Sequence, residues 1–486
     1  MLVQSIFTFK DMDRRSFISV LGISTGSLAL ASSALSRRAQ SFVTGGNLSG
    51  LRSEGYGNLT ATVSKNTGET YLALPKGFEY NVIGKSGSPL ADARVTPRAH
   101  DGMAAFKVRN ELRIVRNHEV SGGRIPRPGS AIGKGNHYDD TAGGGTTTLV
   151  IDPRSRQVVR DFVSLSGTLV NCGGGPTPWG SWISCEETTI GPTIRTSPAG
   201  VMTGGFPKPH GYCFEVFASA NNNLPAIPLK AMGRFEHEAV AIDKRTGIVY
   251  LTEDMTPCGF YRFLPKRSKR LSEGGVLQML AVSAKGEYDT RSGQTAGVAL
   301  DTRWVTIDNP DPAAADVDPQ AVSKQGRSKG GALFARLEGC CPDERGQIYF
   351  TSTSGGNNKG GQIWRYQPVT RDTGRLTMMF ESPSRDVLDM PDNICLMPNS
   401  RLLFICEDSD YVGQGGTPDN YIRILTPDGR MADFAKNITP NFASSEFAGA
   451  TFSPDGKTLF VNIQTAGATF AIWGDWTRFD SYGKRS

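Results

Sequence analysis

Residues 236–254, "EHEAVAIDKRTGIVYLTED", contain two strand-like runs on either side of a turn. The stretch starts with carboxylates, crosses the turn "RTG", and ends in an aliphatic and aromatic run that is closed by Glu253 and Asp254. Such a pattern is typical of two short antiparallel strands joined by a tight turn. One unit of this kind cannot bury its own apolar face, so the rest of the chain should contain partners for it.

Five further stretches have the same form, which makes six units in all. An acid, or in one unit an asparagine, stands at the head of each. These head residues are Glu338 in "LEGCCPDERGQIYFTST" (337–353), Asp392 in "PDNICLMPNSRLLFICED" (391–408), Glu446 in "SEFAGATFSPDGKTLFVNIQ" (445–464) and, in more divergent copies, Asp101 in "HDGMAAFKVRNELRIVRNHE" (100–119) and Asn171 in "NCGGGPTPWGSWISCEE" (171–187). A further strand-like run follows each unit, for example "GFYRFLP" after residue 254. The repeat predicts an all-β, six-bladed β-propeller. A two-sheet sandwich is the alternative, but it gives no reason for the recurrence.

The amino-acid composition agrees with an all-β fold, and the charge argues against one class of binding partner. The 57 glycines and 28 prolines among 486 residues indicate many tight turns. With 53 basic and 47 acidic residues the net charge is only +6, and no basic block is interleaved with aromatic residues. We therefore expect no nucleic-acid partner. We expect a single propeller domain over 71–486, preceded by a loosely structured lead-in over 40–70.

The first 39 residues resemble a twin-arginine signal peptide. Arg14 and Arg15 precede a modestly apolar stretch, 17–35, which contains several Ser, Thr and Gly residues. That stretch is too polar for stable membrane insertion. The sequence therefore predicts export by the twin-arginine machinery to the periplasm or the exterior; a disordered basic leader is the alternative.

In a propeller, equivalent positions of all blades face one central channel. The carboxylates that begin and end the repeats should therefore form one cluster, made of Asp101, Glu119, Glu186, Glu238, Glu253, Glu338, Asp392, Glu407 and Glu446. Like charges at such density raise each other's pKa values unless cations are bound. The sequence predicts a site for several metal ions.

The types of ligand limit the metals. Many carboxylates and only five histidines suit hard cations such as Ca²⁺ or Fe³⁺. His118 and His237 adjoin Glu119 and Glu238, so each ring is either a ligand or an orienting partner of a carboxylate. Cys185 adds a thiolate to the carboxylates, and a thiolate favours a redox-capable metal such as iron.

Ten short motifs together resemble the PhoX family of secreted alkaline phosphatases. They occur in the order "HDGM", "NHE", "GGTTTL", "WGSWISCEE", "HGYCFEV", "HEAVAID", "YLTED", "RLEG", "PDN" and "EFAGATFSPDG", over about residues 95–475. The resemblance implies a six-bladed propeller with two iron ions and several calcium ions, acting on phosphate esters outside the cytoplasm. The chain is shorter than well-known members of the family, which leaves its substrate range open.

The resemblance also implies roles for individual residues. Cys185 would bind iron, Arg336 would hold the substrate phosphate, and Glu338 would bind metal. Glu253 would be a shared ligand, and Glu238, Asp392 and Glu446 would be further ligands. The nucleophile would be an oxygen species bound to metal. This fits the lack of a "GxSxG" motif in a strand-turn-helix context and of a phosphate-binding loop "GxxxxGK[ST]".

Several assignments stay open at this stage. Asn117 and Asn393 either donate to the substrate or shape turns, and Arg116 is either a second phosphate contact or the charge partner of the acidic cluster. Two rival functions also remain. One is a phosphodiesterase or phytase-like hydrolase on the same fold, and the other is a non-catalytic binding propeller stabilised by calcium.

Overall fold

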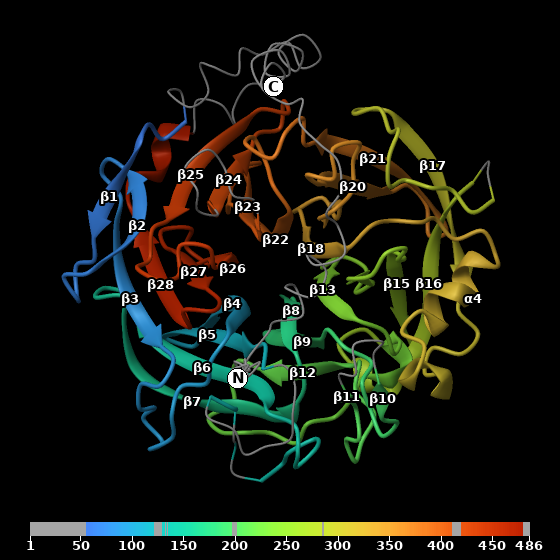
Figure 1. Ribbon diagram of the computed structural model, residues 1–486, viewed down its shortest axis with the longest axis horizontal. Helices are drawn as coiled ribbons and strands as arrows, with labels where there is room; N and C mark the ends of the chain where they lie inside the picture. Colours follow the sequence, from blue (N-terminus) through green and yellow to red (C-terminus); the bar gives the residue numbers. More distant parts are fainter. Residues whose placement is uncertain are drawn as a thin grey trace, which may run out of the picture.

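Six short strands surround one central axis in the computed structural model (Figure 1). The structure describes residues 55–479 apart from 121–128, 132, 134, 197–201, 284–285 and 411–418. Each axial strand contacts the next one along the chain, and the last contacts the first. These strands are β4 (His100–Val108), β8 (Asn171–Pro176), β13 (His237–Ile242), β18 (Leu337–Pro342), β22 (Pro391–Leu396) and β26 (Phe447–Phe452).

Each axial strand begins an antiparallel sheet that extends outward as a blade. The second strands are β5 (Glu111–His118), β9 (Ser181–Glu186), β14 (Val249–Glu253), β19 (Ile348–Ser352), β23 (Leu403–Glu407) and β27 (Leu459–Ile463). The third strands are β6 (Gly144–Asp152), β12 (Cys213–Phe217), β15 (Tyr261–Pro265), β20 (Gln362–Pro368), β24 (Tyr421–Leu425) and β28 (Ala468–Trp473). The prediction of a six-bladed propeller is confirmed.

The outer strands depart from a simple repeat. Blades one, three, four and five have the fourth strands β7 (Gln157–Thr168), β16 (Gly275–Val282), β21 (Thr373–Glu381) and β25 (Met431–Asn437). Strand β17 (Ala299–Thr306) pairs with both β16 and β21, so blades three and four share one nine-stranded sheet.

The N-terminal strands close the ring. Strand β3 (Glu79–Lys85) pairs with β28 and so completes blade six, while β1 (Leu59–Val63) and β2 (Thr70–Pro75) extend blade five beyond β25. Strand β1 thus lies inside the segment 40–70 that was expected to be loosely structured. The predicted signal peptide, 1–39, lies outside the described residues.

Helices are short and lie in the connections. They are η1 (Lys230–Met232), η2 (Leu271–Glu273), η3 (Ala313–Asp316), α4 (Ala321–Arg327) and η4 (Trp476–Phe479); a small hairpin, β10 (Arg195–Thr196) and β11 (Met202–Thr203), lies between β9 and β12. Within the described part of the chain, no helix has the length and apolar character needed to cross a membrane.

Candidate metal centre and active site

A break in strand register repeats at the head of every axial strand. Between each axial strand and its neighbour the pairing skips, as between His100 and Met103 of β4 or between His237 and Val240 of β13. In five blades, the residue that directly follows the pair before this break has a side chain that can bind a metal ion. These residues are Asp101, Cys172, Glu238, Glu338 and Asp392. In blade six, Glu446 directly precedes β26. We call these six the channel residues.

Electrostatic coupling shows that the channel residues face one another. Burial raises the pKa of Glu238 well above its ordinary value, and the charges of Glu338 and Asp101 raise it further. The pKa of Asp392 is likewise raised by burial and by Glu338, Glu238 and Glu446. These carboxylates come from different blades, so they meet only at the axis.

Small residues let the blades approach so closely. A Cβ atom on Gly339 would lie 2.3 Å from the carbonyl oxygen of Asp392, and one on Gly102 would lie 2.8 Å from that of Cys172. Both distances are shorter than side chains tolerate, so only glycine fits behind these channel residues. The "D-G" and "E-G" pairs of the sequence therefore serve the contact between one blade and the next.

Three consecutive residues at the end of each second strand have different surroundings. These strand-end triplets are 117–119, 185–187, 252–254, 351–353, 406–408 and 462–464. Side chains alternate between the two sides of a strand, so neighbouring acids in one triplet cannot serve the same site.

The middle residue of the triplet is structural in three blades. Both oxygens of Glu186 are occupied, by the backbone N–H groups of Leu169 (2.9 Å), Gly211 (2.8 Å) and Tyr212 (3.1 Å) and by Nδ1 of His210 (2.6 Å). Glu253 accepts through Oε2 from the backbone N–H of Gly259 (2.8 Å), while its buried Oε1 has no hydrogen-bond partner among the described residues. Glu407 accepts from the backbone N–H of Tyr421 (3.1 Å). Each carboxylate therefore ties its second strand to the start of the third.

The last residue of the triplet reaches the channel. One ligand atom each from Asp101, Glu119 and Cys172 lie within 4.8 Å of one another, and so do those of Cys172, Glu187 and Glu238. Cys172 belongs to both groups. A thiolate between four carboxylates is a donor set for a metal cluster, since such ligands must be deprotonated and their charges must be offset by cations.

The channel also has unmet bonding capacity. The buried Oε1 atom of Glu238 has no hydrogen-bond partner in the described part of the chain. Burial, followed by the charges of Asp101 and Glu238, raises the pKa of the Cys172 thiol. A bound cation would satisfy the oxygen and reverse the cost of ionising the thiol, so the residues present fit a metal site.

Arg336 brings a positive charge to the carboxylates. Its guanidinium donates from Nε to Asp254 (3.0 Å) and from Nη2 to Glu338 (2.5 Å), and the side chain is 25% exposed. Its backbone has a φ of +47°, a strained conformation outside glycine. Arg336 therefore presents a held, partly exposed guanidinium beside the channel residues.

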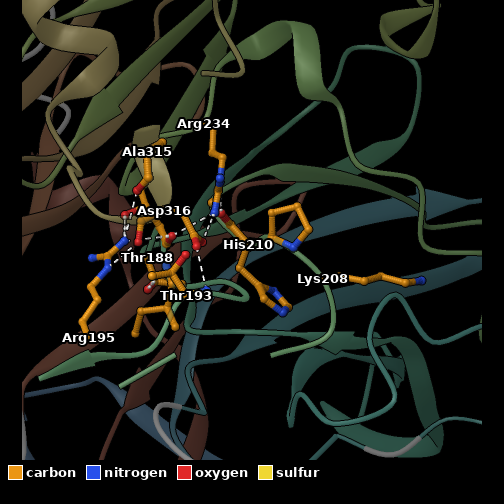
Figure 2. Close-up of polar contacts among 12 residues, drawn as sticks. Thr188, Thr193, Arg195, Lys208, His210, Arg234, Ala315 and Asp316 are labelled. Carbon is orange, nitrogen blue, oxygen red and sulfur yellow. Dashed lines mark hydrogen bonds and ion pairs between the residues drawn. The ribbon is translucent and has the colours of Figure 1, made fainter. Parts of the chain in front are cut away.

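The loop that follows Glu187 is anchored to the segment before α4 (Figure 2). Arg234 is 3% exposed and donates to the carbonyl of His210 (2.8 Å) and to Oδ1 of Asp316 (2.8 Å). Arg195 donates to the carbonyl of Ala315 (3.0 Å), and the N–H of Thr193 donates to Asp316 (2.7 Å). This network ties the loop that follows Glu187 to residues 315 and 316.

Residues 57–467 match the protein family described as "Alkaline phosphatase PhoX". This chain belongs to the PhoX family. An alkaline phosphatase cleaves phosphate esters, so the chain is a phosphoric ester hydrolase of that family.

One solved structure shares the fold, and a second is more distantly similar. PhoX of Pseudomonas fluorescens, solved in complex with vanadate as a transition-state analogue, is 19% identical, with a TM-score of 0.64 over 86% of this chain and 98% of that one. A gluconolactonase of Xanthomonas campestris is 12% identical, with a TM-score of 0.38 over 85% of this chain and 97% of that one. No curated protein matches the chain.

The structure brings together most of the carboxylates that the repeat predicts for the channel. Glu119, Glu238, Glu338, Asp392 and Glu446 all lie at the channel with Asp101. It does not bring Glu186, Glu253 and Glu407 there, because each is the middle residue of its triplet and points into its own blade.

Cys185 also lies away from the channel. Its partner across the sheet is Cys213, and the two Sγ atoms are 3.7 Å apart in an apolar cluster with Ile183 and Val240. The prediction that Cys185 is a metal ligand is not supported, because the register also places it at a different repeat position from Glu253. Glu186 pairs with the first residue of its axial strand as Glu253 does, so Cys185 corresponds to Thr252.

Cys172 is the cysteine that sequence reasoning missed. Asn171 had been taken as the head of its repeat, but Asn171 pairs with Glu186 and its side chain hydrogen-bonds to Ser184 inside the blade (2.9 Å). A signal was present: Cys172 precedes Gly173 as Asp101 precedes Gly102 and Glu338 precedes Gly339.

The remaining candidates bond within the protein. Asn117 donates to the carbonyls of Cys172 (2.8 Å) and Gly173 (2.6 Å) and accepts from Trp182 (2.9 Å), so its amide is occupied. Asn393 donates to Oδ1 of Asp392 (2.8 Å) and accepts from the N–H of Gly449. Both asparagines therefore shape the wall of the channel.

Arg116 and the two histidines lie inside the blades. Arg116 donates to the hydroxyls of Thr469 (2.6 Å) and Thr147 (3.0 Å). His118 also contacts Thr147, at 2.9 Å, and His237 contacts the carbonyl of Gly233, at 3.0 Å. Burial lowers the pKa of His237 to about 4, as expected of a neutral ring in the core.

Proposed function

We propose that this chain is an exported, metal-dependent phosphatase that hydrolyses phosphate monoesters at the axial channel. The observation that carries the proposal is the convergence of Cys172 with Asp101, Glu119, Glu187 and Glu238 in a chain of the PhoX family.

We propose iron and calcium as the metals. Carboxylate oxygens suit calcium and ferric iron, while the thiolate of Cys172 favours iron over a cluster of calcium alone. Asp101, Glu119, Cys172, Glu187 and Glu238 would hold them, with Glu338, Asp392 and Glu446 on the opposite side of the channel. Bound cations neutralise phosphate oxygens and activate water for attack on phosphorus.

The protein's own residues orient the ester. Nε and Nη2 of Arg336 are bonded to Asp254 and Glu338, so Nη1 is the group that would donate to a phosphate oxygen. Asp254 and Glu338 hold the guanidinium in place through the hydrogen bonds described above. Burial raises the pKa of Glu338 even though Arg336 lowers it, and a bound cation would favour the ionised carboxylate that a metal ligand requires.

Export is proposed from the leader. Arg14 and Arg15 before a weakly apolar stretch support recognition by the twin-arginine machinery and a location in the periplasm or outside the cell. That machinery carries folded proteins, so the metal centre would form before export.

The test is hydrolysis of matched esters by protein isolated with its native metals. A phosphatase of this kind should cleave an aryl phosphate monoester far faster than the corresponding diester. A preference for the diester would favour a phosphodiesterase on this fold, and fully metallated protein that cleaves neither would favour a binding propeller.

A further inference from the structure

The first residue of each strand-end triplet lies between two blades. Asn117, Cys185, Thr252, Thr351 and Cys406 each stand directly opposite the break in register of their own axial strand, and Asn462 stands beside it in blade six. All six side chains are 0% exposed. Six equivalent buried positions therefore repeat around the ring.

Four of these side chains donate to the next blade, and all four reach the same kind of atom. The acceptor is the backbone carbonyl oxygen of that blade's channel residue. The pairs are Asn117 with Cys172 (2.8 Å), Thr252 with Glu338 (2.6 Å), Thr351 with Asp392 (3.1 Å) and Asn462 with Asp101 (2.6 Å).

The donors are themselves anchored. The hydroxyl of Thr252 also accepts from the N–H of Ala239 in its own blade (2.9 Å). The amide oxygen of Asn462 accepts from Thr469 (2.6 Å). Each donor is therefore a fixed point in one blade that holds the backbone of the following blade.

Glycines of the axial strands make room for the same hydrogen bonds between neighbouring blades. Gly449 lies where a Cβ atom would be 2.4 Å from the carbonyl oxygen of Asp101, which is the oxygen that Asn462 binds. Gly339 and Gly102 stand in this relation to Asp392 and Cys172. The absence of a side chain lets each carbonyl reach its donor.

We propose that Asn117, Thr252, Thr351 and Asn462 are positioning residues that set the spacing of the channel ligands from one blade to the next. The proposal rests on the metal site of the proposed function. A buried carbonyl must be paired, and a metal site keeps its affinity only while its ligands stay within about 0.5 Å of their places. These four bonds fix the backbone from which each channel side chain extends.

The test compares buried threonine-to-valine variants. Thr252→Val and Thr351→Val keep the shape of the side chain and remove the donor. Thr439→Val is the matched control, since Thr439 is 3% exposed and its hydroxyl donates to the carbonyl of Tyr71 (3.3 Å) away from the channel. Each protein is purified with its native metals and exposed to increasing chelator, and the retained metal is measured by elemental analysis alongside thermal unfolding.

We expect Thr252→Val and Thr351→Val to release metal at chelator concentrations lower by about 10-fold, the usual effect of losing a residue that orients a ligand. Thr439→Val should release metal as the wild type does, even if it unfolds at a lower temperature. Wild-type retention in both channel variants, or equal loss in Thr439→Val, would overturn the inference. A wild-type protein that binds no metal would instead overturn the proposed function and the inference with it.

Discussion

The Sγ atom of Cys185 lies 3.7 Å from the Sγ atom of Cys213, and both side chains are fully buried. Burial and the neighbouring thiol raise the pKa of Cys185, so it stays protonated and packs as a small apolar group. The channel instead receives the thiol of Cys172.

Replacing the two cysteines separates these roles. Cys172→Ser should lower metal affinity by at least about 10-fold, because a direct thiolate ligand is lost. Cys185→Ser should retain wild-type metal content and lose only packing stability. Elemental analysis after purification checks both. Metal loss in Cys185→Ser alone would contradict the assignment.

Arg336→Lys keeps the charge and removes the fork of donors. We expect kcat/KM for a phosphate monoester to fall by about 10- to 100-fold, the value of one or two charged hydrogen bonds. Inhibition by inorganic phosphate should weaken in parallel, because the same group would hold the free anion. Unchanged phosphate inhibition would show that Arg336 acts elsewhere.

The ion pair of His210 with Glu186 predicts a pH dependence of stability. Burial opposes the charged ring, but Glu186 and Asp139 raise the pKa of His210 to about 9. A raised pKa stabilises the folded state fully below the unfolded value of about 6.5, and the contribution of about 3 kcal/mol disappears as the pH rises through about 9. His210→Gln should abolish this dependence when unfolding by urea is measured across that range. An identical slope in the variant would contradict the prediction.

The buried ion pair of Arg234 and Asp316 should contribute more to the free energy of unfolding than an exposed ion pair nearby. Arg234→Gln removes the guanidinium that neutralises Asp316, at a cost of about 3–5 kcal/mol in the free energy of unfolding. Lys230→Gln, which breaks the exposed pair with Asp311 (3.3 Å), should cost about 0–1 kcal/mol. Urea unfolding of both variants checks the contrast, and equal losses would contradict it.

The number of blades was predictable because turn residues and strand-end acids repeat in the sequence. The closure of the ring was not, since β3 pairs with β28 from the far end of the chain and carries no mark of the repeat. Strand β17 likewise joins two blades through edge pairing, which strand propensity does not specify.

At the site, the sequence did not predict on which side of its strand each acid lies. Glu186 and Glu187 are adjacent, and a shift of one residue exchanges the channel for the interior of the blade. The breaks in register decide the outcome, and in the sequence they leave only a weak sign, a glycine after residues such as Asp101 and Cys172. The same breaks turn Cys172, rather than Asn171, toward the axis.

The central claim is that the channel residues hold metal ions required for hydrolysis of phosphate monoesters. Its most direct test is a chelator titration of the wild-type protein, in which bound metal and monoesterase activity are measured on the same samples. We predict that activity falls in proportion to the metal removed and returns when iron and calcium are restored. Full activity in protein stripped of metal would contradict the account.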